Sequence, residues 1–215
     1  MNLKIRFKLS PLFKPANALF RVIKRAQWHL SGSPLPPLHE VKQHRLLRLR
    51  RRFGLSVFVE TGTYRGKMVF AMRPYFGRIV SIELAEELAQ RAQTLFSTCP
   101  EVTIVQGDSA ERLVEVLADL DEPALFWLDG HYSGGETGHG RKSTPILEEL
   151  EAIYGHDVAD HVIAIDDALC FGKERDYPSL DELEQFVVAS GKGRHLEVVD
   201  NMILINPAED GSGKG

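Results

Sequence analysis

The sequence predicts an α/β protein built on a doubly wound, mostly parallel sheet of seven strands that ends in an antiparallel hairpin. Two observations carry this prediction. From residue 55 onward, short apolar runs alternate with amphipathic segments of helical period, the pattern of a parallel sheet covered on both faces. The last two apolar runs, 195–200 and 202–206, have one residue between them, so they can pair only as a hairpin. This layout is Rossmann-like.

Each strand and helix is expected from its own residues. Apolar runs predict strands at 55–60, 78–83, 102–106, 124–129, 161–166, 195–200 and 202–206. Amphipathic segments predict helices at 65–73, 86–97, 110–119, 144–154 and 179–190, with a preceding helix at 39–53. Gly54 is the expected stop of that preceding helix. Thr144 is the expected N-cap of its helix and Pro145 its first residue.

The composition is that of a globular protein, with 215 residues of which 43% are hydrophobic and 26% charged. A chain of this length buries about 70% of its unfolded surface, so it needs neither disulfide nor metal to fold. Cys99 and Cys170 are expected to be buried small hydrophobes in a reducing, cytoplasmic compartment. No apolar run approaches the about 20 residues of a membrane span.

Charge is distributed unevenly along the chain. Residues 1–52 hold 13 Lys and Arg and one acid, Glu40, whereas the remaining residues hold 13 Lys and Arg and 29 acids, giving +12 and −16. Because affinity for phosphate depends on Lys and Arg, the acidic body argues against a nucleic-acid partner. We therefore expect a basic arm and linker at 1–37, a domain at 38–208 and a disordered tail at 209–215.

The basic arm leaves two interpretations open. Lys and Arg interrupt its apolar residues, so it lacks the apolar core and cleavage site of a secretion signal. Residues 18–25 could form a basic amphipathic helix on an anionic membrane, which would make the protein membrane-peripheral. Alternatively, the arm packs on the domain or is partly disordered. A homo-oligomer is also compatible with the sequence.

The residues after the first three strands predict a site for a nucleotide-like ligand, because such ligands bind beyond the carboxyl ends of parallel strands. The first strand runs into Glu60-Thr61-Gly62-Thr63-Tyr64-Arg65-Gly66, whose glycines permit a tight turn and whose carboxylate would attract a cation. Glu83 follows the second strand, where a carboxylate accepts hydrogen bonds from ribose. Asp108 and Ser109 follow the third, where they could recognise adenine or cap a helix.

The chain resembles class I methyltransferases that use S-adenosylmethionine (SAM) in five residues that occur in order: Glu60, Gly62, Gly66, Glu83 and Asp108. The resemblance spans about residues 53–206. It implies that the loop at 60–66 holds the methionine part of SAM, Glu83 the ribose, and Asp108 with Ser109 the adenine. The segment VETGTYRG is similar to the E-x-G-x-x-R-G loop of macrocin-type antibiotic-sugar O-methyltransferases.

A second group of carboxylates follows the fourth and fifth strands. Asp129 comes after the fourth strand and Asp166-Asp167 after the fifth. Bunched carboxylates repel one another unless a cation lies between them, and Mg²⁺ prefers oxygen ligands. Such an ion would orient an acceptor hydroxyl for methyl transfer. The pattern is similar to the metal sites of macrocin-type and catechol-type O-methyltransferases, which implies that Asp129, Asp166 and Asp167 are metal ligands. Alternatively, Asp129 contacts only the cofactor and the Asp pair caps a loop.

The glycine-rich segment 130–143 is expected to cover the substrate. His131 is the expected general base, because histidine titrates near neutral pH. A zinc site made by His131 and His139 is a further hypothesis. The loop cations Arg141, Lys142, Lys173 and Arg175 either surround an acidic substrate or are solvated.

Together these observations favour a SAM-dependent enzyme that methylates a hydroxyl group of a small molecule, such as a sugar or natural-product unit. Asp129, His131, Asp166 and Asp167 are its expected catalytic residues. A nicotinamide-dependent oxidoreductase is disfavoured because the sequence lacks the GxGxxG motif. The remaining hypothesis is a catalytically silent scaffold that a membrane or partner holds by the basic arm.

Overall fold

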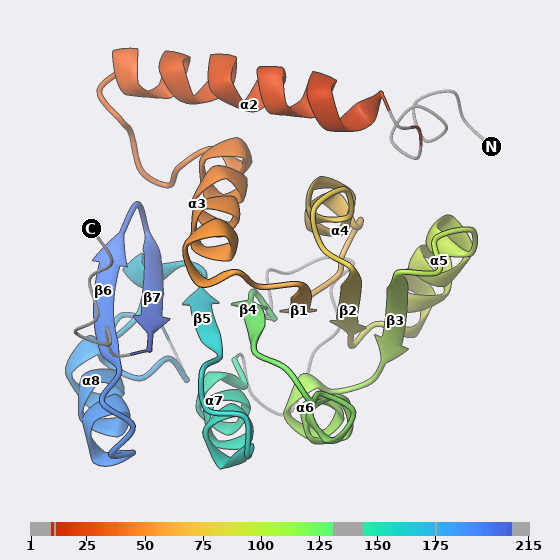
Figure 1. Cartoon of the computed structure of the whole chain (residues 1–215). Helices are drawn as coiled ribbons and strands as arrows, with labels where there is room; N and C mark the ends of the chain where they lie inside the picture. Colours follow the sequence, from red (N-terminus) through yellow and green to blue (C-terminus); the bar gives the residue numbers. More distant parts are fainter. Residues whose placement is uncertain (1–9, 11, 131–143, 175, 208–215) are drawn as a thin grey trace.

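The computed structural model describes residues 10, 12–130, 144–174 and 176–207, and in this part of the chain a sheet lies between two layers of helices (Figure 1). The strands are β1 (Val57–Thr61), β2 (Arg78–Glu83), β3 (Val102–Gln106), β4 (Ala124–Leu128), β5 (Val162–Ile165), β6 (His195–Val199) and β7 (Met202–Asn206). The helices are α2 (Phe13–Leu30), α3 (His39–Phe53), α4 (Lys67–Met72), α5 (Glu86–Phe96), α6 (Ser109–Ala118), α7 (Ile146–Gly155), η1 (Ala168–Cys170) and α8 (Leu180–Ala189).

The described strands form one seven-stranded sheet in the order β3-β2-β1-β4-β5-β7-β6. Neighbouring strands from β3 to β5 are parallel, whereas β7 runs antiparallel to both β5 and β6. Asp200 and Asn201 join β6 to β7 with φ angles of 52° and 61°, as a two-residue hairpin turn requires. The predicted fold class, including the closing hairpin, is confirmed.

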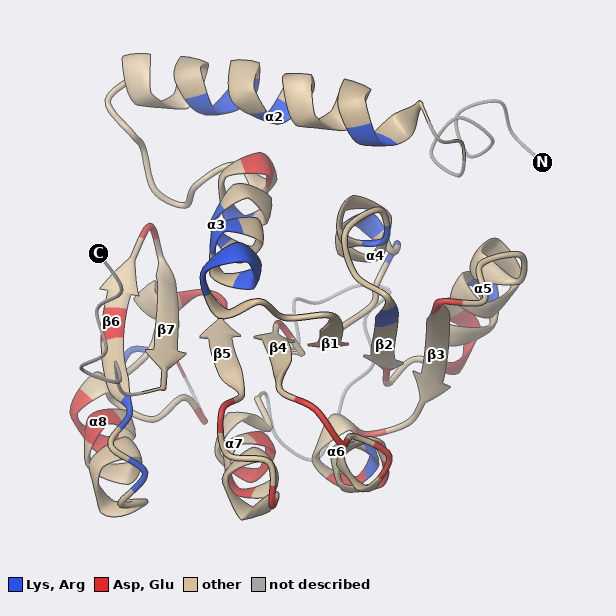
Figure 2. Cartoon of the chain, viewed as in Figure 1, with Lys and Arg blue, Asp and Glu red and all other residues tan. Residues whose placement is uncertain are grey.

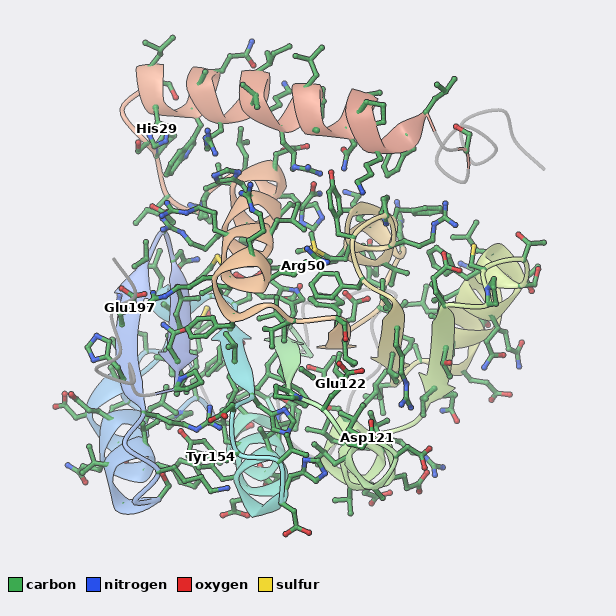
Figure 3. All side chains as sticks on the ribbon, viewed as in Figure 1. His29, Arg50, Asp121, Glu122, Tyr154 and Glu197 are labelled. Carbon is green, nitrogen blue, oxygen red and sulfur yellow. The ribbon has the colours of Figure 1, made fainter. Side chains whose placement is uncertain are left out.

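Both faces of the sheet are buried, and this explains the continuous apolar runs in the sequence. Phe58 of β1 and Trp127 of β4 point to the side covered by α3, α4 and α5. Val59 and Phe126, one residue away in each strand, point to the side covered by α6, α7 and α8. Figure 3 shows the side chains that fill the space between the sheet and these helices. The sheet order reverses between β1 and β4, and ligands of such sheets bind at this reversal.

Three of the expected helices begin later than predicted, α8 by the single residue Ser179, which is its N-cap. Pro145, rather than Thr144, is the N-cap of α7, and the helix starts at Ile146. The helix expected at 65–73 starts at Lys67, because Gly66 is its N-cap with a φ of 64°. Gly54 ends α3 in the left-handed conformation, as predicted.

The two cysteines differ in their surroundings. Cys99 is buried, as expected. Cys170 is only half-buried, and its Sγ donates a hydrogen bond to the Glu174 carboxylate over 3.3 Å. The prediction that both are buried hydrophobes is therefore wrong for Cys170, which lies in η1 rather than in a strand or core helix.

The amphipathic segment 18–25 of the basic arm belongs to a longer helix, α2, which lies across α3 (Figure 1). No helix of the described residues is both long and apolar enough to cross a membrane. The division of the chain into arm, domain and tail stays a prediction, and residues 209–215 lie outside the described residues.

Candidate active site

The loop between β1 and α4 turns tightly against the end of β4. Gly62 has a φ of 85°, and a Cβ atom on it would lie 2.5 Å from the carbonyl oxygen of Asp129. A Cβ atom on Gly66 would lie 2.8 Å from the Phe96 ring. A larger residue at either position would therefore displace the loop. The two glycines determine the backbone path of the segment expected to hold the methionine part of SAM.

Glu60 lies buried at the end of β1, below this loop. Its Oε1 accepts a hydrogen bond from Ser81 Oγ of β2 over 2.6 Å, and Thr63 Oγ1 lies 2.5 Å from the same Ser81 oxygen. Burial raises the pKa of Glu60 to about 8, although the Ser81 hydrogen bond lowers it; the charge of Glu83 adds to the rise. Glu60 is therefore mostly protonated at neutral pH, and a cation beside it would favour its ionised form.

Glu83 and Asp108 both accept hydrogen bonds from backbone N–H groups. Glu83 Oε2 accepts from Tyr64 N over 2.7 Å, and its Oε1 accepts from Ala85 N over 2.9 Å, so this carboxylate holds the loop against β2. Asp108 Oδ1 accepts from Ala110 N over 3.1 Å and is the N-cap of α6. The capping role considered for Asp108 is thus present, while its contact with adenine stays a prediction.

Glu149, in the first turn of α7, is a buried carboxyl group that the sequence analysis missed. Burial raises its pKa to about 7, whereas the neighbouring Ser109 and Thr61 side chains lower it. The contacts place it beside the end of β1 and the start of α6. A sequence signal existed, because Glu149 falls within the apolar stripe formed by Ile146 and Ile153.

Three carboxylates meet after β4 and β5, as the sequence predicted for the ends of neighbouring strands. Asp166 N donates to the carbonyl oxygen of Leu128, the last residue of β4, over 3.0 Å. Desolvation raises the pKa of Asp129 well above its ordinary value, and the charges of Asp166 and Asp167 raise it further. The arrangement concentrates negative charge beside the glycine loop.

The cation among these carboxylates is Lys42 of α3. Its Nζ lies 2.5 Å from Asp166 Oδ2 and 3.9 Å from Asp167 Oδ1, and its charge lowers the pKa of Asp129. The sequence predicted a helix at 39–53 but gave Lys42 no role in the site. The available signal was the spacing of three between His39, Lys42 and Arg45, which places them along one side of a helix.

The hairpin turn between β6 and β7 holds Asp167 in place. Asn201 Nδ2 donates to Asp167 Oδ1 over 3.1 Å, and Asn201 Oδ1 accepts from Leu169 N over 2.7 Å. Arg45 of α3 forms an ion pair with Asp200 of the same turn. The loop after β5 is therefore fixed by two elements that are distant from it in sequence.

A Mg²⁺ ion does not fit this arrangement. The Lys42 ammonium group contacts Asp166 and lies close to Asp167, and the other Asp166 oxygen accepts from Asp167 N over 2.8 Å. Among the residues that the structure describes, no three His, Cys, Asp or Glu side chains are placed to hold a metal ion. The expectation of Mg²⁺ assumed that the cation must come from solution, whereas α3 supplies one.

Several expected site residues lie outside the described residues. They are His131, His139, Arg141, Lys142 and Arg175. The general base, the zinc hypothesis and the substrate cover over 131–143 therefore stay predictions.

Comparison with known proteins places this geometry in a known fold. No family model and no curated protein matches the sequence. Solved structures of methyltransferases do resemble this chain. The O-methyltransferase TomG from Streptomyces achromogenes, involved in tomaymycin synthesis and in complex with SAM, is 17% identical, with a TM-score of 0.57 over 87% of this chain and 89% of that one.

Two further structures agree with the first. An O-methyltransferase from Bacillus cereus in complex with SAH is 13% identical, with a TM-score of 0.58 over 86% of this chain and 90% of that one. The SAH-bound methyltransferase PaMTH1 from Podospora anserina is 13% identical, with a TM-score of 0.57 over 90% and 88%. At identities this low, the structural similarity is evidence for the fold alone. The chain has the fold of the class I, SAM-dependent methyltransferases.

Proposed function

We propose that the protein transfers the methyl group of SAM to a hydroxyl oxygen of a small molecule, such as a sugar or another natural-product unit. The main support is one juxtaposition. Glu60, whose ionised form a cation would stabilise, and the glycine loop lie next to the carboxylates that follow β4 and β5. This is the place where the sheet order reverses. A methyl donor and its acceptor need such adjacent sites.

The residues around the glycine loop bind the cofactor in this proposal. SAM supplies a methyl group on a sulfonium cation. Glu60 is the partner of its ammonium group, and Gly62 lets its methionine part approach the backbone of Thr61 and Thr63. Tyr64 and Gly66 complete this loop. Glu83 accepts hydrogen bonds from the ribose while it still holds the loop.

The adenine end lies at the start of α6. Asp108 and Ser109 recognise the ring in this proposal, and the buried carboxyl group of Glu149 lies against Ser109. Asp129 borders the methionine end in this proposal, because its carbonyl oxygen would lie 2.5 Å from a Cβ atom on Gly62.

The carboxylates after β4 and β5 receive the acceptor. A hydroxyl group becomes a better nucleophile as it loses its proton, and a carboxylate whose pKa is raised accepts a proton more readily at neutral pH. Asp129 meets this condition. His131 is the second candidate base. Lys42 offsets the charge of Asp166 and Asp167, which is the task that the sequence analysis gave to Mg²⁺.

Calorimetric titration of the full chain with S-adenosylhomocysteine, with and without Mg²⁺, tests this function. We expect stoichiometric binding at micromolar concentrations that does not depend on Mg²⁺. Binding would then justify a screen of hydroxylated acceptors with labelled SAM. Absence of binding in both conditions would contradict the proposal and favour the catalytically silent scaffold.

A further inference from the structure

Helix α2 turns its apolar side away from the rest of the protein. A row of exposed residues with helical spacing runs along its whole length: Leu12, Pro15, Ala16, Leu19, Val22, Ile23, Ala26 and Leu30. We call this row the outward stripe. Leu19 is 63% exposed and Leu30 is 89% exposed, so these are not side chains at the margin of a core.

The opposite side of α2 carries its buried side chains, and these combine polar and apolar contacts, with Phe13 in the core cluster under α3 and α4. The buried Arg21 donates to Tyr75 OH over 2.8 Å, and Lys14 Nζ lies 4.9 Å from the centre of the Tyr75 ring. Trp28 is also buried, and its Nε1 donates to the Pro34 carbonyl oxygen over 2.8 Å. Figure 2 shows the Lys and Arg residues of α2 on the side that faces α3. The aliphatic row of α2 is thus left uncovered, whereas a helix that covers a hydrophobic core buries such a row.

A continuous row of exposed apolar side chains on a protein surface marks an interaction surface. The surrounding charge distinguishes between partners. Glu40 is the sole acid in α2 and α3, and the Lys and Arg of these helices gather at one end of the molecule, whereas Asp and Glu are prominent on α5, α6, α7 and α8 (Figure 2). Two copies joined through α2 would bring like charges together. An anionic lipid surface would attract the same charges.

We propose that the outward stripe is a docking surface for an anionic lipid bilayer, on which α2 lies parallel to the membrane plane. The stripe enters the boundary between head groups and acyl chains. Lys24 and Arg25 are half-buried outside the stripe, and together with the other Lys and Arg of α2 and α3 they attract the helix to an anionic surface through their long-range charge. This inference is independent of methyl transfer, because none of these residues belongs to the candidate active site.

Co-sedimentation of the full chain with lipid vesicles tests the proposal. We expect the protein to bind vesicles of equimolar phosphatidylcholine and phosphatidylglycerol, to bind phosphatidylcholine alone more weakly, and to lose affinity at high salt. The double variant Leu19→Glu with Ile23→Glu should bind the mixed vesicles at least about tenfold more weakly, because two aliphatic side chains no longer enter the bilayer.

A matched pair of variants controls for the added charge. Val22 lies in the outward stripe, whereas Val188 is an exposed valine of α8 outside it. We expect Val22→Glu to weaken vesicle binding and Val188→Glu to leave it unchanged. Titration with S-adenosylhomocysteine should be the same for all variants, which verifies that they fold and separates lipid docking from cofactor binding.

Two results would overturn the proposal. One is that the wild type fails to bind vesicles, or that it binds no better than the stripe variants. The other is a wild-type dimer, seen by light scattering, that becomes a monomer in the Leu19→Glu and Ile23→Glu variant without any vesicle binding. That result would assign the outward stripe to a second copy of the chain.

Discussion

At the scale of single residues, the candidate site is a set of carboxyl groups whose protonation depends on what lies beside them. Burial raises the pKa values of Glu60, Glu149 and Asp166, but Asp166 already has a cation, Lys42, in a direct ion pair. A cationic ligand would therefore change the charge of Glu60 more than that of Asp166. This difference makes the role of each residue separately measurable.

Glu60 should release a proton when the cofactor product binds. Its pKa of about 8 leaves it mostly protonated at pH 7, and the ammonium group of S-adenosylhomocysteine would lower that pKa. Calorimetry in buffers of different ionisation enthalpy would measure the released proton. Glu60→Gln should abolish the release and weaken binding about tenfold. Glu87→Gln, at an exposed position of α5, should change neither quantity.

Lys42 should replace a metal ion in methyl transfer. We expect Lys42→Met to lower kcat at least about tenfold with little change in the affinity for S-adenosylhomocysteine, because Asp166 and Asp167 would keep an unbalanced charge. Lys42→Arg, which keeps the charge, should retain more activity. Wild-type turnover should survive chelation by EDTA. Loss of turnover with EDTA that Mg²⁺ restores would show that the sequence-based metal hypothesis was right.

At the scale of elements, α2 and α3 both precede the sheet and are both basic, yet they have different tasks. α3 contacts β4 and β5 and brings Lys42 to the carboxylates. α2 contacts α3 and is held mainly through Arg21, Trp28 and Phe13. The candidate site therefore depends on α3. Helix α2 packs on the outer side of α3 and contributes no residue to the site.

Removal of residues 1–31 should leave the affinity for S-adenosylhomocysteine within about twofold of the wild-type value, because α2 has no residue in the candidate site. The melting temperature should fall by a few degrees as the contacts of Arg21 and Trp28 are lost. Calorimetry and thermal unfolding measure the two effects. A large loss of affinity would show that α2 takes part in the site.

At the scale of the whole molecule, buried acids and buried histidines oppose each other in the dependence of stability on pH. His39, His44 and His161 have pKa values lowered to about 4, so they favour the folded state increasingly as pH rises towards 6.5. Glu60 and Glu149, with pKa values raised to about 8 and 7, disfavour it as pH rises above 4.5. The two trends offset each other in weakly acidic solution.

Above pH 6.5 these histidines no longer change the stability, whereas Glu60 and Glu149 still do. The free energy of unfolding should therefore fall as pH rises to 8. The fall should be about 2 kcal/mol, since each group contributes about 1.4 kcal/mol per pH unit below its folded-state pKa. Denaturant unfolding at the two pH values measures it. Glu60→Gln should flatten the decline. A stability that rises over this range would contradict the assigned burial of Glu60.

The sequence alone was sufficient for the sheet and for the candidate residues at its strand ends, because these depend on local patterns. Alternating apolar runs indicated the strands, and the single residue between the last two runs required the hairpin. The resemblance was carried by the order of Glu60, Gly62, Gly66, Glu83 and Asp108. Residue spacing along a strand or loop is visible in the sequence.

Contacts between elements that are distant in the sequence were decided by the tertiary structure. Lys42 meets Asp166 across 124 positions, so a cation among these carboxylates comes from an element far away in the sequence. Glu149 lies against the Ser109 and Thr61 side chains, which come from elements far from α7 in the sequence. The direction in which α2 presents its apolar side was equally hidden, because a helix has the same periodicity whichever face is buried. Local periodicity identifies an amphipathic helix, but only the packing of Arg21 against Tyr75 determines which side remains exposed.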